Sequence, residues 1–196
     1  MEIFFKKIKI PYRFGRPKSR SIKCLTVLFM HHVFMLVLMA ISPSLSAQAA
    51  KASTLRKTFS RTTTVSVQIQ ADPAIVWALL TNAGDYARWN STVLSIEGDI
   101  APGEKIRLRS TLDPKRTFKL KVKTFEPEKL LVWGDGMGKR RYSLQVLDKS
   151  SVLFSMTEKI GGPLFPLFAN MIPPFDDAFD QFAADLKKEA ELIQRK

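Results

Sequence analysis

Hydrophobic and polar residues alternate along most of the chain after residue 61. In TTTVSVQIQ, residues 62–70, Val65, Val67 and Ile69 share one face and polar side chains occupy the other. A period of two is typical of a half-buried strand. Comparable runs predict further strands at 93–100, 105–112, 117–125, 130–135, 140–147 and 151–160. Short turns, including one at 113–115, join most of these strands and favour an antiparallel sheet of seven strands.

Two short helices are predicted between the first two strands. Asp72 can cap the free amides of a helix that begins at Pro73, because both residue types favour those positions. Residues 74–80 are apolar on every side, so this helix must be covered all round. Asp85–Trp89 reads as a second helical turn after Gly84. The pair forms an elbow rich in aromatic residues.

The last part of the chain changes to a helical period. Phe175, Phe179, Phe182, Leu186 and Ile193 form an apolar stripe, with acidic residues near its start and basic residues near its end. This pattern predicts one long amphipathic helix whose charges match the helix dipole. Before it, residues 163–175 are apolar and broken by four prolines, which excludes a single regular helix. That segment is either a lid over the fold or a packed cap.

Residues 1–49 resemble an export signal. A basic region ends at Lys23, an apolar run spans Leu25–Ile41, and small residues at Ala47 and Ala49 suit cleavage before Ala50. The alternative is an uncleaved anchor, although the apolar run is short for a membrane span. Either interpretation exports the C-terminal part to the periplasm or the medium. We therefore divide the chain into a signal peptide at 1–49, a linker at 50–61 and a ligand-binding domain at 62–196.

Charge and residue types narrow the chemistry. The formal net charge is +13, but residues 50–196 carry 23 basic and 17 acidic side chains, a net charge of +6. Export and the lack of a stacking motif argue against nucleic acid as a partner. The chain has one cysteine and two histidines, and all three lie in the leader, at Cys24, His31 and His32. The exported part therefore has no thiol nucleophile, imidazole base or His/Cys metal site, and we expect no cofactor.

The order of motifs resembles the START/SRPBCC superfamily, and within it the bacterial polyketide cyclase/dehydrase-like group. The motifs are DPAIVWALLTNAGDYARWN, a Pro-Gly turn followed by KIRLRS, LLVWGD, and TEKIGGPL leading into FDQFAADLKKEAE. They extend over about residues 62–193. The resemblance implies an α+β helix-grip fold, in which a curved antiparallel sheet holds the long C-terminal helix. It also implies an interior pocket for an apolar or aromatic ligand.

The alternation of each strand selects the side chains expected to line that pocket. The inward set on the strands, the helix and the elbow comprises Leu108, Phe118, Leu120, Trp133, Tyr142, Phe154, Met156, Phe175, Phe179, Phe182, Trp77 and Trp89. Apolar walls with a few polar groups are usual for small-molecule sites. The alternative is that these are ordinary core residues.

A charged group shares the inward side near the end of the sheet. If the turns set the registers, Tyr142 faces Trp133 and Met156, and Arg140 faces Asp135 on one side and Glu158 on the other. Inward charges must be paired to be tolerated. We hypothesise that Arg140 binds an anionic head group while Asp135 and Glu158 orient it. The alternative is an ion cluster that satisfies itself.

These observations favour non-catalytic binding or carriage of a hydrophobic small molecule or lipid. The leading alternative is an enzyme of the polyketide cyclase/aromatase type that uses Tyr142, Glu158 or Arg140. A third class is a partner-binding module built on the same fold. Outward rows of lysine and arginine on the strands 105–109 and 119–123 read as a solvated face, with an anionic membrane surface as the alternative partner.

Overall fold

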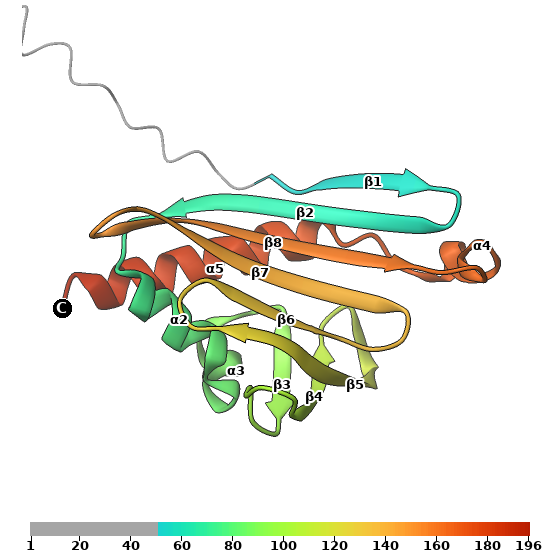
Figure 1. Cartoon of the computed structure of the whole chain (residues 1–196), viewed down its shortest axis with the longest axis horizontal. Helices are drawn as coiled ribbons and strands as arrows, with labels where there is room; N and C mark the ends of the chain where they lie inside the picture. The colour runs from blue at the N-terminus through green and yellow to red at the C-terminus, as the bar shows by residue number, and fades with distance from the viewer. Residues whose placement is uncertain (1–50) are drawn as a thin grey trace, which may run out of the picture. The chain divides into compact units, whose positions relative to one another are not determined.

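The structure, a computed structural model, describes residues 51–196. The predicted signal peptide at 1–49 lies outside the described residues. One antiparallel sheet of eight strands has the order β1-β2-β8-β7-β6-β5-β4-β3 (Figure 1). The strands are β1 Ser53–Lys57, β2 Ser60–Ile69, β3 Val93–Glu97, β4 Lys105–Ser110, β5 Asp113–Glu126, β6 Leu130–Gly134, β7 Gly138–Asp148 and β8 Ser151–Gly161.

The expected count of seven strands is wrong by one. The additional strand is β1, which lies in the segment expected to be a linker and pairs with β2 at the sheet edge. An edge strand has one partner and buries little, so β1 carries no alternating signal, and Leu55 is 58 % exposed. Its anchors are side chains instead: the Thr54 hydroxyl donates to Asp176 at 3.0 Å, and the Ala52 amide donates to Asp180.

The turn expected at 113–115 is also wrong, because β5 already begins at Asp113. Ser110 and Asp113 pair directly, so the reversal is confined to the two residues between them. Pro114 follows inside the strand even though it has no amide hydrogen to donate. It is tolerated because β6 pairs with β5 only from Lys121 onward, which leaves one edge of this stretch without a strand partner.

The two short helices after β2 and the long C-terminal helix lie where the sequence predicts them, whereas the short turns α4 and η2 in the proline-rich segment were not predicted. They are α2 Pro73–Thr81, the 3₁₀ turn η1 Ala83–Asp85, α3 Tyr86–Trp89, α4 Phe165–Phe168, the 3₁₀ turn η2 Ala169–Met171 and α5 Asp176–Gln194. The Asp72 side chain accepts the Ala74 amide at 2.8 Å and caps α2 as expected. Figure 1 shows α5 along one face of the sheet. The apolar helix α2 packs against α5, and this contact buries part of its apolar surface.

A cluster of six aromatic side chains fills the space between α5 and the sheet at one end. The cluster comprises Tyr86, Trp89, Trp133, Tyr142, Phe154 and Phe182. The Trp133 and Tyr142 rings lie 4.9 Å apart at a steep angle, and Phe154 stacks on Phe182 at 6.3 Å. Such pairs add to the stabilisation from burial. Within residues 51–196 this cluster joins the elbow, the sheet and α5.

Glycine is required where β6 turns into β7. A Cβ at Gly134 would lie 2.1 Å from the Gly138 carbonyl oxygen, whereas a Cβ at Gly136 would have nothing within 4 Å. We predict that Gly134→Ala lowers the free energy of unfolding by about 2 kcal/mol, because the hairpin backbone must move apart. Gly136→Ala, the matched control, should change it by less than about 0.5 kcal/mol. Urea unfolding of both variants measures the difference, and equal values would contradict the close approach.

Candidate functional site

A cavity of about 470 Å³ is lined by strands β4 to β8 and by residues 163–175, which we call the cap and which end just before α5. This volume is within the range of small-molecule pockets. Its walls are mostly apolar. The lining residues are Leu108, Ser110, Leu112, Asp113, Arg116, Phe118, Leu120, Trp133, Gly134, Asp135, Met137, Gly138, Arg140, Glu158, Ile160, Phe168, Met171, Ile172, Pro173 and Phe175. Several of these, Met137 and Met171 among them, are also exposed to solvent.

Eight of the residues predicted from the sequence lie in this wall. They are Leu108, Phe118, Leu120, Trp133, Asp135, Arg140, Glu158 and Phe175. Five of them have an apolar side chain: four come from β4, β5 and β6, and Phe175 directly precedes α5. The alternation therefore identified which side of each strand faces the interior.

The remaining seven predicted residues do not line the cavity. They are Trp77, Trp89, Tyr142, Phe154, Met156, Phe179 and Phe182. Trp77 packs edge-on against Phe125, with ring centroids 5.1 Å apart, and the other six are buried in the core. Their placement corrects the predicted wall: Trp89, Tyr142, Phe154 and Phe182 belong to the aromatic cluster, and Met156 and Phe179 are packed in the core.

Sequence reasoning missed the part of the wall that the cap supplies. Phe168, Met171, Ile172 and Pro173 line the cavity from this segment. The sequence did indicate a cover at this place, because the apolar segment broken by prolines was interpreted as a lid or a packed cap. No strand or helix period assigned individual residues in it to the inside, so they could not be named.

Arg140 and Glu158 form an ion pair in the cavity wall. They lie directly opposite each other on β7 and β8, and Arg140 Nε donates to Glu158 Oε2. Their side chains are 17 % and 15 % exposed, so solvent screens the pair only in part. The Arg140 guanidinium also lies 5.3 Å from the centre of the Phe179 ring. This half of the predicted constellation has the geometry expected.

Asp135 is not a partner of Arg140. The register puts Trp133, and not Asp135, opposite Arg140, because the turn begins at Asp135 and β6 ends at Gly134. The Asp135 carboxylate instead accepts the amides of Met137 and Gly138 at 2.8 and 2.7 Å. Aspartate commonly stabilises turns in this way. The same register puts Leu131, rather than Trp133, opposite Tyr142.

Tyr142 lies beside the ion pair with its hydroxyl buried. Within residues 51–196 this hydroxyl has no hydrogen-bond partner, and the side chain is fully buried. Burial raises the pKa of Tyr142 above its ordinary value, and the Arg140 charge offsets only part of that effect. For Arg140, burial opposes the charged form, but the Glu158 charge and the tyrosine outweigh it and raise the pKa. Arg140 is therefore a permanent cation, and Tyr142 stays neutral near pH 7.

Arg61 holds the cap against the sheet. Its guanidinium donates from Nη1 to the Ile172 carbonyl at 3.1 Å and from Nη2 to the Pro173 carbonyl at 2.7 Å. The same group lies 4.5 Å from the centre of the Phe175 ring. Burial and the nearby Arg56 charge lower the pKa of Arg61. This buried arginine, which sequence reasoning missed, fixes the cap residues that close the cavity.

The described part of the chain shows no metal centre. No group of three or more aspartate, glutamate, histidine or cysteine side chains in residues 51–196 is arranged to hold a metal ion. In the same residues no helix combines the length and the apolar character that a bilayer span requires.

A family profile described as polyketide cyclase / dehydrase and lipid transport matches residues 60–191. The chain belongs to this family. Its description covers both polyketide chemistry and lipid transport, and both involve hydrophobic molecules. No curated protein sequence matches the chain.

Three solved structures share the fold at low sequence identity. A START superfamily protein from Mycobacterium smegmatis is 14 % identical with a TM-score of 0.50, over 67 % of this chain and 98 % of that one. The Zhui aromatase/cyclase from Streptomyces sp. R1128 is 14 % identical with a TM-score of 0.53, over 67 % and 94 %. A conserved protein of unknown function from Enterococcus faecalis is 16 % identical with a TM-score of 0.54, over 72 % and 77 %. These likenesses establish the helix-grip fold.

The ion pair in the cavity wall should show strong energetic coupling. We predict that Glu158→Leu alone lowers the free energy of unfolding by about 2–3 kcal/mol, because Arg140 loses its partner in a mostly buried place. Adding Arg140→Met should recover much of that loss, since no charge is then left unpaired. A double-mutant cycle by urea unfolding measures the coupling. The matched control is the cross-strand pair Glu97–Arg107, whose side chains are 64 % exposed; its coupling should stay below about 1 kcal/mol.

Removing the Arg61 guanidinium should loosen the cap. We predict that Arg61→Met speeds amide hydrogen exchange at Phe165, Leu167 and Ile172, whose amides bond within the cap, by at least about tenfold. Arg56→Met is the matched control, because Arg56 is exposed and lies opposite Arg61 on the neighbouring strand. Exchange in β7 and β8 should not change. Faster exchange there by the same factor would mean global destabilisation and would contradict the proposed clamp.

Proposed function

We propose that this protein binds and carries a hydrophobic small molecule or lipid in the interior cavity, without catalysis. The observation that carries the proposal is the cavity of about 470 Å³ with mostly apolar walls, next to a core that is otherwise filled. An apolar space of this size is favourable for a ligand that water solvates poorly. The family description, which includes lipid transport, supports the same class of ligand.

Arg140 gives the proposed ligand a polar end. The hydrogen bond of its guanidinium to Glu158 uses Nε, and Arg140 lines the cavity, so its terminal N–H groups are the proposed donors to a ligand acceptor. A ligand with a carboxylate or another anionic head group would bind there with its apolar part against Leu120 and Phe118. Glu158 would hold the guanidinium in position. Arg140→Ala should therefore weaken an acidic ligand more than its neutral analogue.

We also propose that the protein works outside the cytoplasm. The support is the leader itself: basic residues up to Lys23, the apolar run and the small residues before Ala50. The absence of cysteine from residues 50–196 means that the exported part does not depend on disulfide formation. A free ligand carrier in that compartment would shield a hydrophobic molecule from water.

An enzyme of the polyketide cyclase/aromatase type is the second candidate. It is favoured by the family description and by the three polar groups Arg140, Glu158 and Tyr142 near the cavity. Two observations weigh against it. Glu158 is held in an ion pair with Arg140, and the raised pKa of Tyr142 leaves that residue a poor base near neutral pH. Turnover of a polyketone mimic that is lost in Glu158→Gln would favour the enzyme.

Filling the cavity should abolish ligand retention. Leu120→Trp adds bulk to the wall, whereas Leu94→Trp, the matched control, changes a 39 % exposed residue outside the wall. We predict that native mass spectrometry of protein from its own host finds a hydrophobic adduct on the natural chain and on Leu94→Trp. The adduct should fall by at least about tenfold on Leu120→Trp, because the side chain occupies the site. An equal adduct on both variants would place the ligand elsewhere and defeat the carrier proposal.

A further inference from the structure

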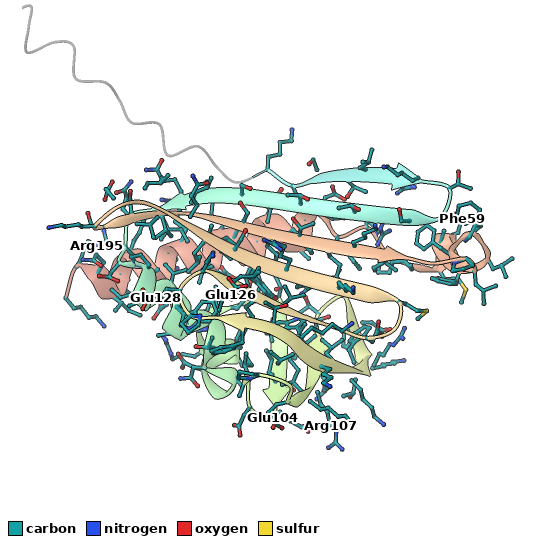
Figure 2. All side chains as sticks on the ribbon, viewed as in Figure 1. Phe59, Glu104, Arg107, Glu126, Glu128 and Arg195 are labelled. Carbon is teal, nitrogen blue, oxygen red and sulfur yellow. The ribbon has the colours of Figure 1, made fainter. Side chains whose placement is uncertain are left out.

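Five large apolar side chains are exposed at the end of the molecule where the cavity opens. The set, which we call the apolar tip, comprises Phe59, Met137, Leu164, Leu167 and Met171, with exposed fractions of 59, 49, 66, 80 and 82 %. They come from the β1–β2 turn, the β6–β7 turn and the cap. Figure 2 shows Phe59 at the end of the molecule where α4 lies. Scattered apolar residues on a surface need no explanation, but a cluster from three segments does.

Backbone hydrogen bonds hold the three segments together. The Gly162 amide donates to the Phe59 carbonyl at 3.0 Å, and the Gly161 amide donates to the Met137 carbonyl at 3.0 Å. The cap begins directly after these glycines. The apolar tip is therefore one connected surface of the fold and not three separate loops.

Exposed cations surround the apolar tip. They are Arg56, Lys57, Lys115, Arg116, Lys139 and Lys159, and we call them the cationic rim. Lys57 ends β1 two residues before Phe59, and Lys139 lies opposite Lys159 two residues from both Met137 and Gly161. Among residues 51–196, none of the six takes part in an ion pair.

Three carboxylates near the rim have other partners, and among residues 51–196 none of them forms an ion pair with a rim cation. Glu158 pairs with Arg140, the Asp135 carboxylate accepts two turn amides, and Asp176 accepts the Thr54 hydroxyl. The surface therefore combines apolar side chains at its centre with unpaired positive charge around them. A partner that fits this surface would have an apolar layer beneath a layer of negative charge.

We propose that the apolar tip and the cationic rim dock on the surface of an anionic phospholipid bilayer. The tip would enter the boundary between head groups and acyl chains, and the rim would contact the lipid phosphates. A water-soluble protein partner would need charge complementarity as well as an apolar pocket, whereas a bilayer supplies both features over any area. The favoured partner is therefore a lipid surface and not a second protein.

Docking would set the cavity mouth against the bilayer. Met137 and Met171 belong both to the apolar tip and to the cavity wall, so a ligand could pass between membrane and cavity without crossing water. This consequence rests on the proposed carrier function. The docking itself does not, because it depends only on the surface.

The test attaches a polarity-sensitive fluorophore to the apolar tip and uses the full-length chain. Cys24, the single cysteine, is replaced by serine, and the label is attached at Leu167→Cys or, as the control, at Val146→Cys, which is 56 % exposed at the opposite end of β7. Vesicles contain phosphatidylcholine alone or equal parts of phosphatidylcholine and phosphatidylglycerol. Both labels share residues 1–50, so any membrane anchoring by that segment affects them equally.

We expect the emission of the label at 167 to shift to the blue on the anionic vesicles only, and to be quenched by spin-labelled lipid tails. The label at 146 should stay in water. Leu167→Glu with Met171→Glu should weaken vesicle binding by at least about tenfold, whereas Val146→Glu with Leu147→Glu, the matched control, should not. Added salt should weaken docking, because it screens the rim.

Three results would overturn the proposal. The label at 167 could stay in water, both labels could respond alike, or the chain could form a dimer without lipid that Leu167→Glu abolishes while vesicles leave the label unchanged. The last result would assign the surface to a second copy of the chain. The natural chain separates the two proposals: docking by a chain that retains no ligand would overturn the carrier function alone, and retention of a ligand by a chain that does not dock would overturn the docking alone. Leu120→Trp, which fills the cavity, should still dock.

Discussion

The contact between Phe182 of α5 and the aromatic residues of the sheet is the constraint on which the rest of the structure depends. Phe182 meets Tyr142 and Phe154 on one side and Trp89 on the other. This contact holds the helix at a fixed height above one end of the sheet. The cavity lies beyond the start of the helix, where Phe175 and the cap residues line it together with the strands.

Charged side chains lie on two sides of the cavity, in the wall and at the cap, and they have different roles there. In the wall, Arg140 and Glu158 form an ion pair, and both residues line the cavity. At the cap, Arg61 binds two carbonyl groups in a segment whose prolines prevent a regular helix. The first arrangement suits a head group, and the second holds a cover made of residues without strong backbone pairing. The proposed carrier function needs a polar contact for the ligand and a cover with few internal bonds. Arg140 would supply the contact, and Arg61 holds the cover.

The sequence was sufficient to predict seven of the eight strands and the long helix, because burial on one face leaves a period in each of them. The helix-grip arrangement of these elements was predicted from the family resemblance. It predicted which side chains face inward, but not whether they would meet a neighbour or the cavity. Phe118 and Phe154 have the same inward parity, yet one lines the cavity and the other is packed against Phe182. That difference depends on the twist of the sheet and the place of the helix, which no local pattern encodes. The edge strand β1 and the turn role of Asp135 were missed because neither depends on burial.

The most direct test is a crystal structure of the protein under xenon pressure. Xenon enters dry apolar cavities and does not displace packed side chains. If the interior is hollow as described, xenon will bind between Leu120, Trp133 and Phe175, or a co-purified ligand will occupy that space. If the cap and the strands close on each other so that neither xenon nor a ligand is found there, the central claim is wrong.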